Sequence, residues 1–208
     1  MSGPRLTAKL LGPDDYKVMP WKNGRGATTE LAIEPAGAAL ADFDWRISVA
    51  DVTEDGDFSR FPGYDRTLVV AEGNGMELEF DGASAPQRLA GPGHGAMFSG
   101  DWLTRGRLID GPVRDFNVMS ARGRMHHECE VIAGGPVEFV WEPGAETLFC
   151  HCIAGTLVLK MRGSAEWNLE PRQSLWLPVT EGHPGFSQLM VMPHSRGTLA
   201  VVARLRKV

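Results

Sequence analysis

Several segments of this chain alternate apolar and polar residues with a period of two. The clearest are residues 45–49 (WRISV), 76–80 (MELEF) and 114–118 (RDFNV). Side chains of a strand point alternately to opposite faces of its sheet, so each segment is predicted to be a strand with one buried face. Residues 198–203 (TLAVVA) are more uniformly apolar and predict a central strand.

Turn residues divide the chain between these segments. The 25 glycines and 14 prolines are spread along the whole length, and turn signals recur roughly every 8 to 12 residues, as in all-β architecture. Helix signals are weak, since the best candidate, residues 36–42, contains Gly37. The predicted fold class is therefore all-β.

The two halves of the chain carry a repeated pattern. Residues 68–78 match residues 148–158, and residues 89–93 match residues 169–173, with a constant offset of 80 positions. Each copy reads as a strand, a glycine turn, a second strand, and a Pro/Gly turn that opens onto another strand. A duplicated module predicts two similar β units, although chance similarity between generic hairpins is the alternative.

This repeated unit resembles the cupin half-motif. The resemblance implies a bicupin, with two jelly-roll-like β-barrels in tandem. The first barrel is expected over residues 1–125 and to carry the ligand site, and the second, over residues 126–208, is expected to be structural.

The composition of the chain limits which classes of partner it is expected to bind. The chain has 208 residues, 43% of them hydrophobic, a formal net charge of −5 and a pI of about 5.7. No basic block predicts nucleic-acid binding, and no apolar run approaches the ~20 residues of a membrane helix. With no secretory signal and three cysteines that form no CxxC pair, a cytoplasmic location is expected. The sequence leaves a homodimer open.

Residues 20–31 (PWKNGRGATTEL) concentrate a tryptophan, cations, an amide and glycines directly before a predicted strand. Loops with so many directed donors beside a large aromatic often hold small polar ligands. The alternative is a glycine turn packed under one core tryptophan.

Five ordered blocks give a narrower resemblance, to the HutD/Ves family. They are residues 20–30, 45–52, 56–66, 98–101 and 111–119. The resemblance implies a bacterial cytoplasmic bicupin associated with histidine utilisation, for which no reaction is firmly assigned.

The histidines do not predict a metal site. Metal-dependent cupins carry a histidine pair and a glutamate on one strand, but residues 68–80 contain no histidine. His126 and His127 are adjacent and point to opposite faces of a strand, and the same argument applies to Cys150, His151 and Cys152. We therefore expect neither a metal nor another cofactor.

Polar side chains share faces on three predicted strands and could line one cavity. Lys22, Arg46 and Arg66 suit a carboxylate, Trp21 offers an apolar wall, and amide and hydroxyl groups could read a formyl group. The alternative is that these faces are solvated. The predicted ligand-binding residues are Trp21, Lys22, Asn23, Thr28, Glu30, Arg46, Ser48, Arg66, Asp115 and Asn117.

Three functions are consistent with these residues. The first is a metal-independent protein that binds a small polar anion, and that senses or buffers a histidine-degradation intermediate such as N-formylglutamate or urocanate. The second is a metal-free hydrolase or isomerase acting on a small carboxylate, with Glu30 or Asp115 as general base. The third is an interaction scaffold whose barrels are only structural.

Overall fold

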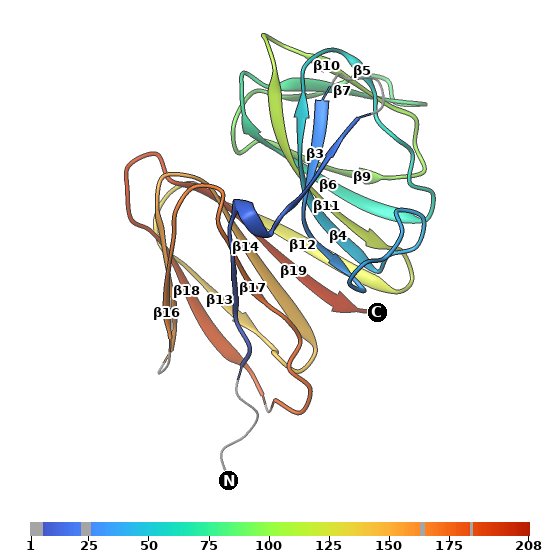
Figure 1. Ribbon diagram of the computed structural model, residues 1–208. Coiled ribbons are helices and arrows are strands. Elements are labelled where there is room, and N and C mark those ends of the chain that lie inside the picture. The colour runs from blue at the N-terminus through green and yellow to red at the C-terminus, as the bar shows by residue number, and fades with distance from the viewer. Residues whose placement is uncertain (1–5, 22–25, 163–164, 184) are drawn as a thin grey trace. The chain divides into compact units, whose positions relative to one another are not determined.

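The computed structural model describes residues 6–21, 26–162, 165–183 and 185–208, and it confirms the all-β prediction. One short 3-10 helix, Pro13–Asp15, is the exception to strand structure in these ranges. The chain divides into two compact units (Figure 1). We call Tyr16–His126 the N-terminal unit, and Met1–Asp15 with His127–Val208 the C-terminal unit.

The N-terminal unit contains a six-stranded and a four-stranded antiparallel sheet. The larger sheet has the order β2-β3-β4-β11-β6-β9 and the smaller β5-β10-β7-β8. The strands are β2 (Lys17–Pro20), β3 (Gly26–Glu34), β4 (Trp45–Val52), β5 (Gly56–Asp57), β6 (Tyr64–Glu72), β7 (Met76–Phe80), β8 (Gln87–Leu89), β9 (Gly95–Ser99), β10 (Thr104–Leu108) and β11 (Val113–Ala121).

The C-terminal unit also contains two sheets, with the orders β1-β17-β14-β19-β12 and β13-β18-β15-β16. Its strands are β1 (Lys9–Leu11), β12 (Met125–Ile132), β13 (Val137–Trp141), β14 (Glu146–Ala154), β15 (Leu157–Met161), β16 (Glu166–Leu169), β17 (Ser174–Leu177), β18 (Ser187–Pro193) and β19 (Leu199–Lys207).

The strand orders confirm the internal repeat. The run β4-β11-β6-β9 in the N-terminal unit corresponds to β12-β19-β14-β17 in the C-terminal unit, and β5-β10-β7-β8 corresponds to β13-β18-β15-β16. The glycines of the matched turns, Gly75 and Gly155, both have positive φ, of 97° and 68°. A side chain is strained in that conformation, which explains why both copies keep glycine there.

Each unit has its own apolar core, to which both of its sheets contribute. In the N-terminal unit, Leu68 and Val70 of the larger sheet belong to the same buried cluster as Met76 and Leu78 of the smaller sheet. In the C-terminal unit, Leu148 and Leu159 come from different sheets and again share one cluster. The sheets stay open, so the expected closed barrels are corrected to pairs of open sheets around a shared core.

The first strand changes the expected domain boundary. We expected residues 1–125 to form one unit, but Lys9–Leu11 pairs with β17 and groups with the C-terminal unit. Backbone pairing across more than 160 positions leaves little trace in a three-residue strand, so the sequence could not reveal it. No helix in the described ranges is long and apolar enough to span a membrane.

Candidate ligand-binding site

A cavity of about 650 Å³ opens within the N-terminal unit. Its walls come from strands β2, β3, β4, β6 and β11 and from the segment at residues 54–61. The described residues that line it are Met19, Pro20, Trp21, Thr28, Leu40, Arg46, Ser48, Ala50, Val52, Glu54, Asp55, Gly56, Asp57, Phe58, Ser59, Phe61, Arg66, Asn117 and Met119.

The strand register explains why both arginines point into the cavity. Met119 of β11 lies opposite Arg46 of β4 on one side and opposite Arg66 of β6 on the other. Residues paired across strands point to the same face of a sheet, so both guanidinium groups enter the cavity. Two positions along, Asn117 lies opposite Ser48 by the same rule. The sequence therefore correctly predicted which face of its strand each of Arg46, Ser48 and Asn117 occupies.

Arg66 is almost completely buried, at 4% exposure, among aromatic rings. Its guanidinium carbon lies 5.0 to 5.6 Å from the ring centroids of Phe58, Phe61 and Phe98, within the range of cation–π attraction. Burial, partly opposed by Asp115 and reinforced by Arg46, lowers the pKa of Arg66 to about 10. The group therefore stays cationic at neutral pH.

Arg66 is held by neutral acceptors. Its Nη1 donates to the Ser59 carbonyl oxygen at 3.2 Å, and its Nε and Nη2 donate to Asn117 Oδ1 at 3.4 and 3.2 Å. Within the described ranges no carboxylate lies close enough to form an ion pair with it. A guanidinium has five N–H donors, and these contacts use three. The remaining two are available for an anion.

Asp115 lies two residues before Asn117 on the same face of β11 and does not line the cavity. Its side chain is fully buried, and its Oδ1 accepts a 3.0 Å hydrogen bond from Asn117 Nδ2. Its Oδ2 is buried with no partner among the described residues. Desolvation raises the pKa of Asp115 to about 6, although Asn117 and Arg66 act in the opposite direction.

Arg46 has a carboxylate partner, which is Glu30. The Arg46 Nε lies 2.8 Å from Glu30 Oε2, with both side chains mostly buried. The sequence left Glu30 or Asp115 as the alternatives for this pairing, and the structure selects Glu30. A bulge between Glu30 and Ala32 shifts the register there. The ion pair occupies Nε alone among the five donors of Arg46.

Trp21 packs at the start of β3. Its Nε1 donates to Thr28 Oγ1 at 2.8 Å, and its backbone N–H donates to the Gly26 carbonyl oxygen at 2.9 Å. A Cβ at Gly26 would overlap the Asp51 carbonyl oxygen and come within 3.0 Å of the Trp21 ring. Glycine is therefore required by close packing. Lys22 and Asn23 lie outside the described residues.

Six of the ten predicted residues line the cavity: Trp21, Thr28, Arg46, Ser48, Arg66 and Asn117. Glu30 and Asp115 do not line the cavity, but Glu30 pairs with Arg46 and Asp115 accepts a hydrogen bond from Asn117. The sequence analysis missed the aromatic side chains around Arg66, although Phe58 and Phe61 stand inside the block at residues 56–66. It also missed the acidic rim formed by Glu54, Asp55 and Asp57.

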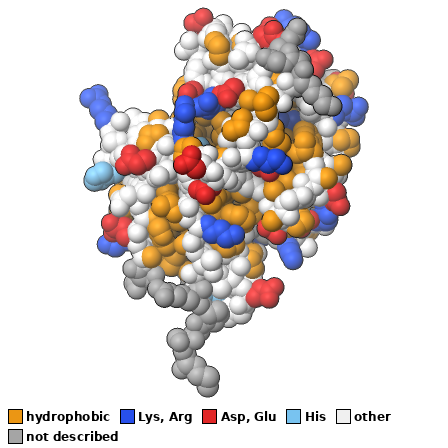
Figure 2. Space-filling model, viewed as in Figure 1, with side chains coloured by type: hydrophobic (Ala, Val, Ile, Leu, Met, Phe, Trp, Pro, Cys, Tyr) orange, Lys and Arg blue, Asp and Glu red, His pale blue; other side chains and the backbone are white. Residues whose placement is uncertain are grey.

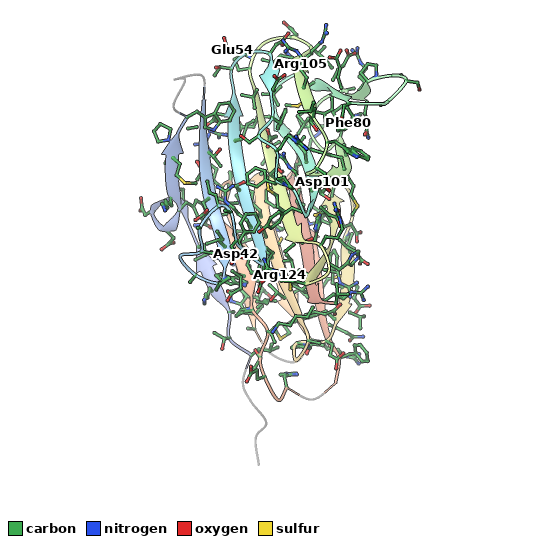
Figure 3. The ribbon with its side chains drawn as sticks, turned by 90° about the vertical axis from the view of Figure 1, so that its right-hand side faces the viewer. Asp42, Glu54, Phe80, Asp101, Arg105 and Arg124 are labelled. Carbon is green, nitrogen blue, oxygen red and sulfur yellow. The ribbon has the colours of Figure 1, made fainter. Side chains whose placement is uncertain are left out.

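Figure 3 shows where this rim lies in the N-terminal unit. Glu54 and Arg105 lie together at one end, whereas Asp42 and Arg124 lie toward the other end. Arg105 forms a 3.2 Å ion pair with Asp57 of the rim. On the face seen in Figure 2, acidic and basic side chains are interspersed with hydrophobic ones rather than gathered by sign.

The corresponding position in the C-terminal unit is filled by ion pairs. The offset of 80 places Glu146 at the position of Arg66. Arg204 lies opposite Leu148 as Asn117 lies opposite Leu68, so Arg204 corresponds to Asn117. Arg204 Nη2 contacts the two Glu146 carboxylate oxygens at 3.0 and 3.2 Å. Its charge is therefore compensated within the protein.

A hollow of about 800 Å³ does exist in the C-terminal unit, but it lies elsewhere. Trp167 and Phe186 line it, together with Arg162. Arg162 donates a 2.8 Å hydrogen bond to Gln188. This hollow is therefore not the counterpart of the cavity in the N-terminal unit.

Metal-binding chemistry has little support in the described ranges. They contain no group of three or more His, Cys, Asp or Glu side chains placed to hold a metal ion. His151 Nδ1 lies 2.8 Å from Ser174 Oγ in a buried pair. Burial raises the pKa of the Cys152 thiol to about 11, and that of Cys150 still further. These thiols are therefore protonated packing groups.

A family model decides the relationship of the chain to known proteins. The HutD model matches residues 13–190. The chain belongs to the HutD family. An uncharacterised 21.2 kDa protein in the hutC 3′ region of Pseudomonas putida is 43% identical over 116 residues, which cover 56% of this chain and 60% of that protein. Protein Ves of Citrobacter koseri is 35% identical over 191 residues, covering 86% and 94% of the two chains.

Two solved structures from Pseudomonas share the architecture of this chain. HutD from Pseudomonas fluorescens SBW25 is 32% identical, with a TM-score of 0.77 and coverage of 97% of this chain and 100% of its own. A conserved protein of unknown function from Pseudomonas aeruginosa PAO1 is 33% identical, with a TM-score of 0.81 and coverage of 97% and 98%. Oxalate decarboxylase from Lactobacillus farciminis shares the fold alone, at 10% identity and a TM-score of 0.63 over 99% and 87% of the two chains.

Proposed function

We propose that this HutD-family protein binds a small carboxylate in the cavity of its N-terminal unit, without a metal. The observation that supports the proposal is the pair of buried arginines on either side of Met119, of which only Arg46 has an ion-pair partner among the described residues. An unpaired buried cation is costly. A bound carboxylate would compensate the charge of Arg66 and use the donors that remain on both groups.

The framework for this site is a bicupin in our interpretation. The two units share one strand order, and each pairs a four-stranded sheet with a larger one. The eight strands that correspond between the units, four in each of two sheets, match the jelly-roll form of all-β architecture. The ion-paired cluster around Arg204 supports a structural role for the second copy.

The family relationship suggests the ligand class. The Pseudomonas putida relative is described by its place in the hutC 3′ region, and HutD from Pseudomonas fluorescens was solved in a formate condition. We propose a histidine-degradation intermediate such as N-formylglutamate or urocanate, sensed or buffered in the cytoplasm of a bacterium. Arg46 and Arg66 would hold carboxylates, and the Trp21 and Phe58 rings would pack against the ligand's apolar part.

Binding without turnover fits the cavity better than hydrolysis or isomerisation does. A general base must reach the proton that it abstracts. Glu30 is paired with Arg46, and Asp115 is bonded to Asn117 and does not line the cavity. Neither candidate base therefore faces a ligand directly.

Calorimetric titration with formate, N-formyl-L-glutamate, urocanate and L-glutamate tests the proposal, with product analysis after prolonged incubation. We expect at least one of these acids to bind without being converted to a product. The Arg66→Met substitution should weaken the binding of that acid by tenfold or more, since a charge-assisted contact contributes about 1.5–3 kcal/mol. Arg88→Met is the matched control, because Arg88 is exposed, pairs with Glu77 and lies outside the cavity. Equal losses in both variants, or no binding by any of the acids, would contradict the proposal.

A further inference from the structure

Asp115 and Asn117 form a hydrogen-bonded relay to the cavity arginine. Asn117 donates from Nδ2 to Asp115 Oδ1 and accepts from Arg66 through Oδ1. The carboxylate therefore fixes which end of the Asn117 amide faces Arg66. Because Asp115 is bonded to Asn117 but does not line the cavity, it can act on a ligand at Arg66 without touching it.

The surroundings of Asp115 make its charge sensitive to its neighbours. It is fully buried, and one of its oxygens has no partner among the described residues. Its cross-strand neighbours are Ala50 of β4 and Val70 of β6, which offer no polar side chain. The charged groups that act on it are Arg66 of β6, which favours the ionised form, and Asp51 of β4, which opposes it.

We propose, on the basis of the anion site proposed above, that Asp115 is a proton-linked positioning residue, and that an anion binding beside Arg66 is accompanied by proton uptake at the Asp115 carboxyl. Ionised Asp115 offsets part of the positive charge of Arg66. An anion takes over that role and repels the Asp115 carboxylate, so the bound state favours the protonated acid. Protonated Asp115 keeps an acceptor oxygen for Asn117 Nδ2, so the relay survives the change.

The direction of the effect follows from linkage. If binding takes up a proton, affinity for the anion falls as the pH rises through the range in which Asp115 ionises. The pKa of Asp115 is raised to about 6 in the free protein, and a bound anion raises this pKa further. Asp115 therefore ionises between roughly pH 5.5 and 8 over the free and bound states together. A change of about one pKa unit on binding corresponds to about tenfold in affinity. No described residue lining the cavity is a histidine, and the carboxylates that line it, Glu54, Asp55 and Asp57, are exposed. Asp115 is instead fully buried, and the Asp115→Asn variant separates its contribution from that of the rim.

Two measurements on the full chain test this, with formate as the probe. The first follows the carboxyl ¹³C signal of Asp115 against pH, in the free protein and with saturating formate. We expect a midpoint near 6 that moves upward with formate. The second is calorimetric titration at pH 5.5 and 7.5 in two buffers of different ionisation enthalpy, which gives the protons taken up. For a change of one pKa unit on binding, we expect roughly sixfold weaker binding at the higher pH.

Asp115→Asn is expected to bind formate with no proton uptake and with an affinity that does not depend on pH. Glu77→Gln removes an exposed acid that pairs with Arg88 outside the cavity, and it should behave as wild type. If Asp115→Asn does not fold, the signal of wild-type Asp115 still decides the question. Formate binding without proton uptake, or uptake retained in Asp115→Asn, overturns the role of Asp115 alone. If formate leaves the Arg66 and Asn117 side-chain signals unmoved, the anion site itself is wrong.

Discussion

Asn117 Oδ1 accepts hydrogen bonds from both Nε and Nη2 of Arg66, at 3.4 and 3.2 Å, so a buried cation is held by a neutral amide. A carboxylate at the same place would neutralise the guanidinium and leave little attraction for a ligand. The amide positions the group and preserves its charge. In the C-terminal unit, Arg204 occupies the position equivalent to Asn117 and is paired with a carboxylate from Glu146, which stands where Arg66 stands.

Asn117→Asp should convert the cavity into an ion-paired site. A carboxylate beside Arg66 would compete with a bound anion, and we expect affinity for small carboxylates to fall by tenfold or more, about 1.4 kcal/mol or above. Calorimetric titration measures the loss. Ser48→Ala serves as a control for simple loss of a polar contact beside Asn117, with an expected effect smaller than that of the new charge. Unchanged affinity in Asn117→Asp would show that the ligand does not approach Arg66.

Arg46→Met should weaken both folding and binding. It leaves the Glu30 carboxylate, which is only 13% exposed, without the partner at 2.8 Å, and removing one partner of a mostly buried pair costs roughly 2–4 kcal/mol. Thermal and urea unfolding measure this loss.

The double variant Arg46→Met/Glu30→Gln separates the two roles of Arg46. Removing the stranded charge should restore much of the stability but none of the carboxylate affinity. If the double variant recovers binding, Arg46 would be a structural residue and not a ligand contact.

Tyr64→Phe should destabilise the end of the N-terminal unit away from the rim. The Tyr64 hydroxyl donates to the Phe43 carbonyl oxygen at 3.0 Å and accepts from the Phe43 N–H at 3.1 Å. Both residues are buried, and their rings lie 4.3 Å apart between centroids. Leaving a buried N–H unpaired costs about 1–3 kcal/mol. A urea midpoint equal to that of wild type would contradict this assignment.

The stability of the protein should depend on pH through Asp115. Its folded pKa of about 6 lies above the ordinary value, so the folded state binds more protons between about pH 4 and 6, and stability from this group falls as the pH rises through that window. The Asp115→Asn variant lacks this pH-dependent contribution to the free energy of unfolding, because asparagine does not titrate. The stability of Asp115→Asn relative to wild type should therefore improve by on the order of 2–3 kcal/mol from pH 4 to pH 7. Urea unfolding at several pH values measures it, and a constant difference would contradict the burial argument.

Much of the fold could be predicted from local patterns. Alternation at residues 45–49 and 114–118 correctly assigned β4 and β11 and the faces of Arg46, Ser48 and Asn117, because strand geometry has a period of two. The repeat at an offset of 80 correctly indicated two related units, because equal turns and strands impose the same strand order.

The pairing of charges was decided only by the tertiary structure. Glu30 and Asp115 were equivalent partners for Arg46 in the sequence, and the register of β3 against β4, with its bulge, chose Glu30. The Phe98 ring reaches Arg66 from β9, a separate strand. Strand β1 joins a sheet whose other strands lie beyond residue 124. These relationships depend on contacts between residues far apart in the chain, which a period of two does not encode, whereas the choice of face depends only on immediate neighbours.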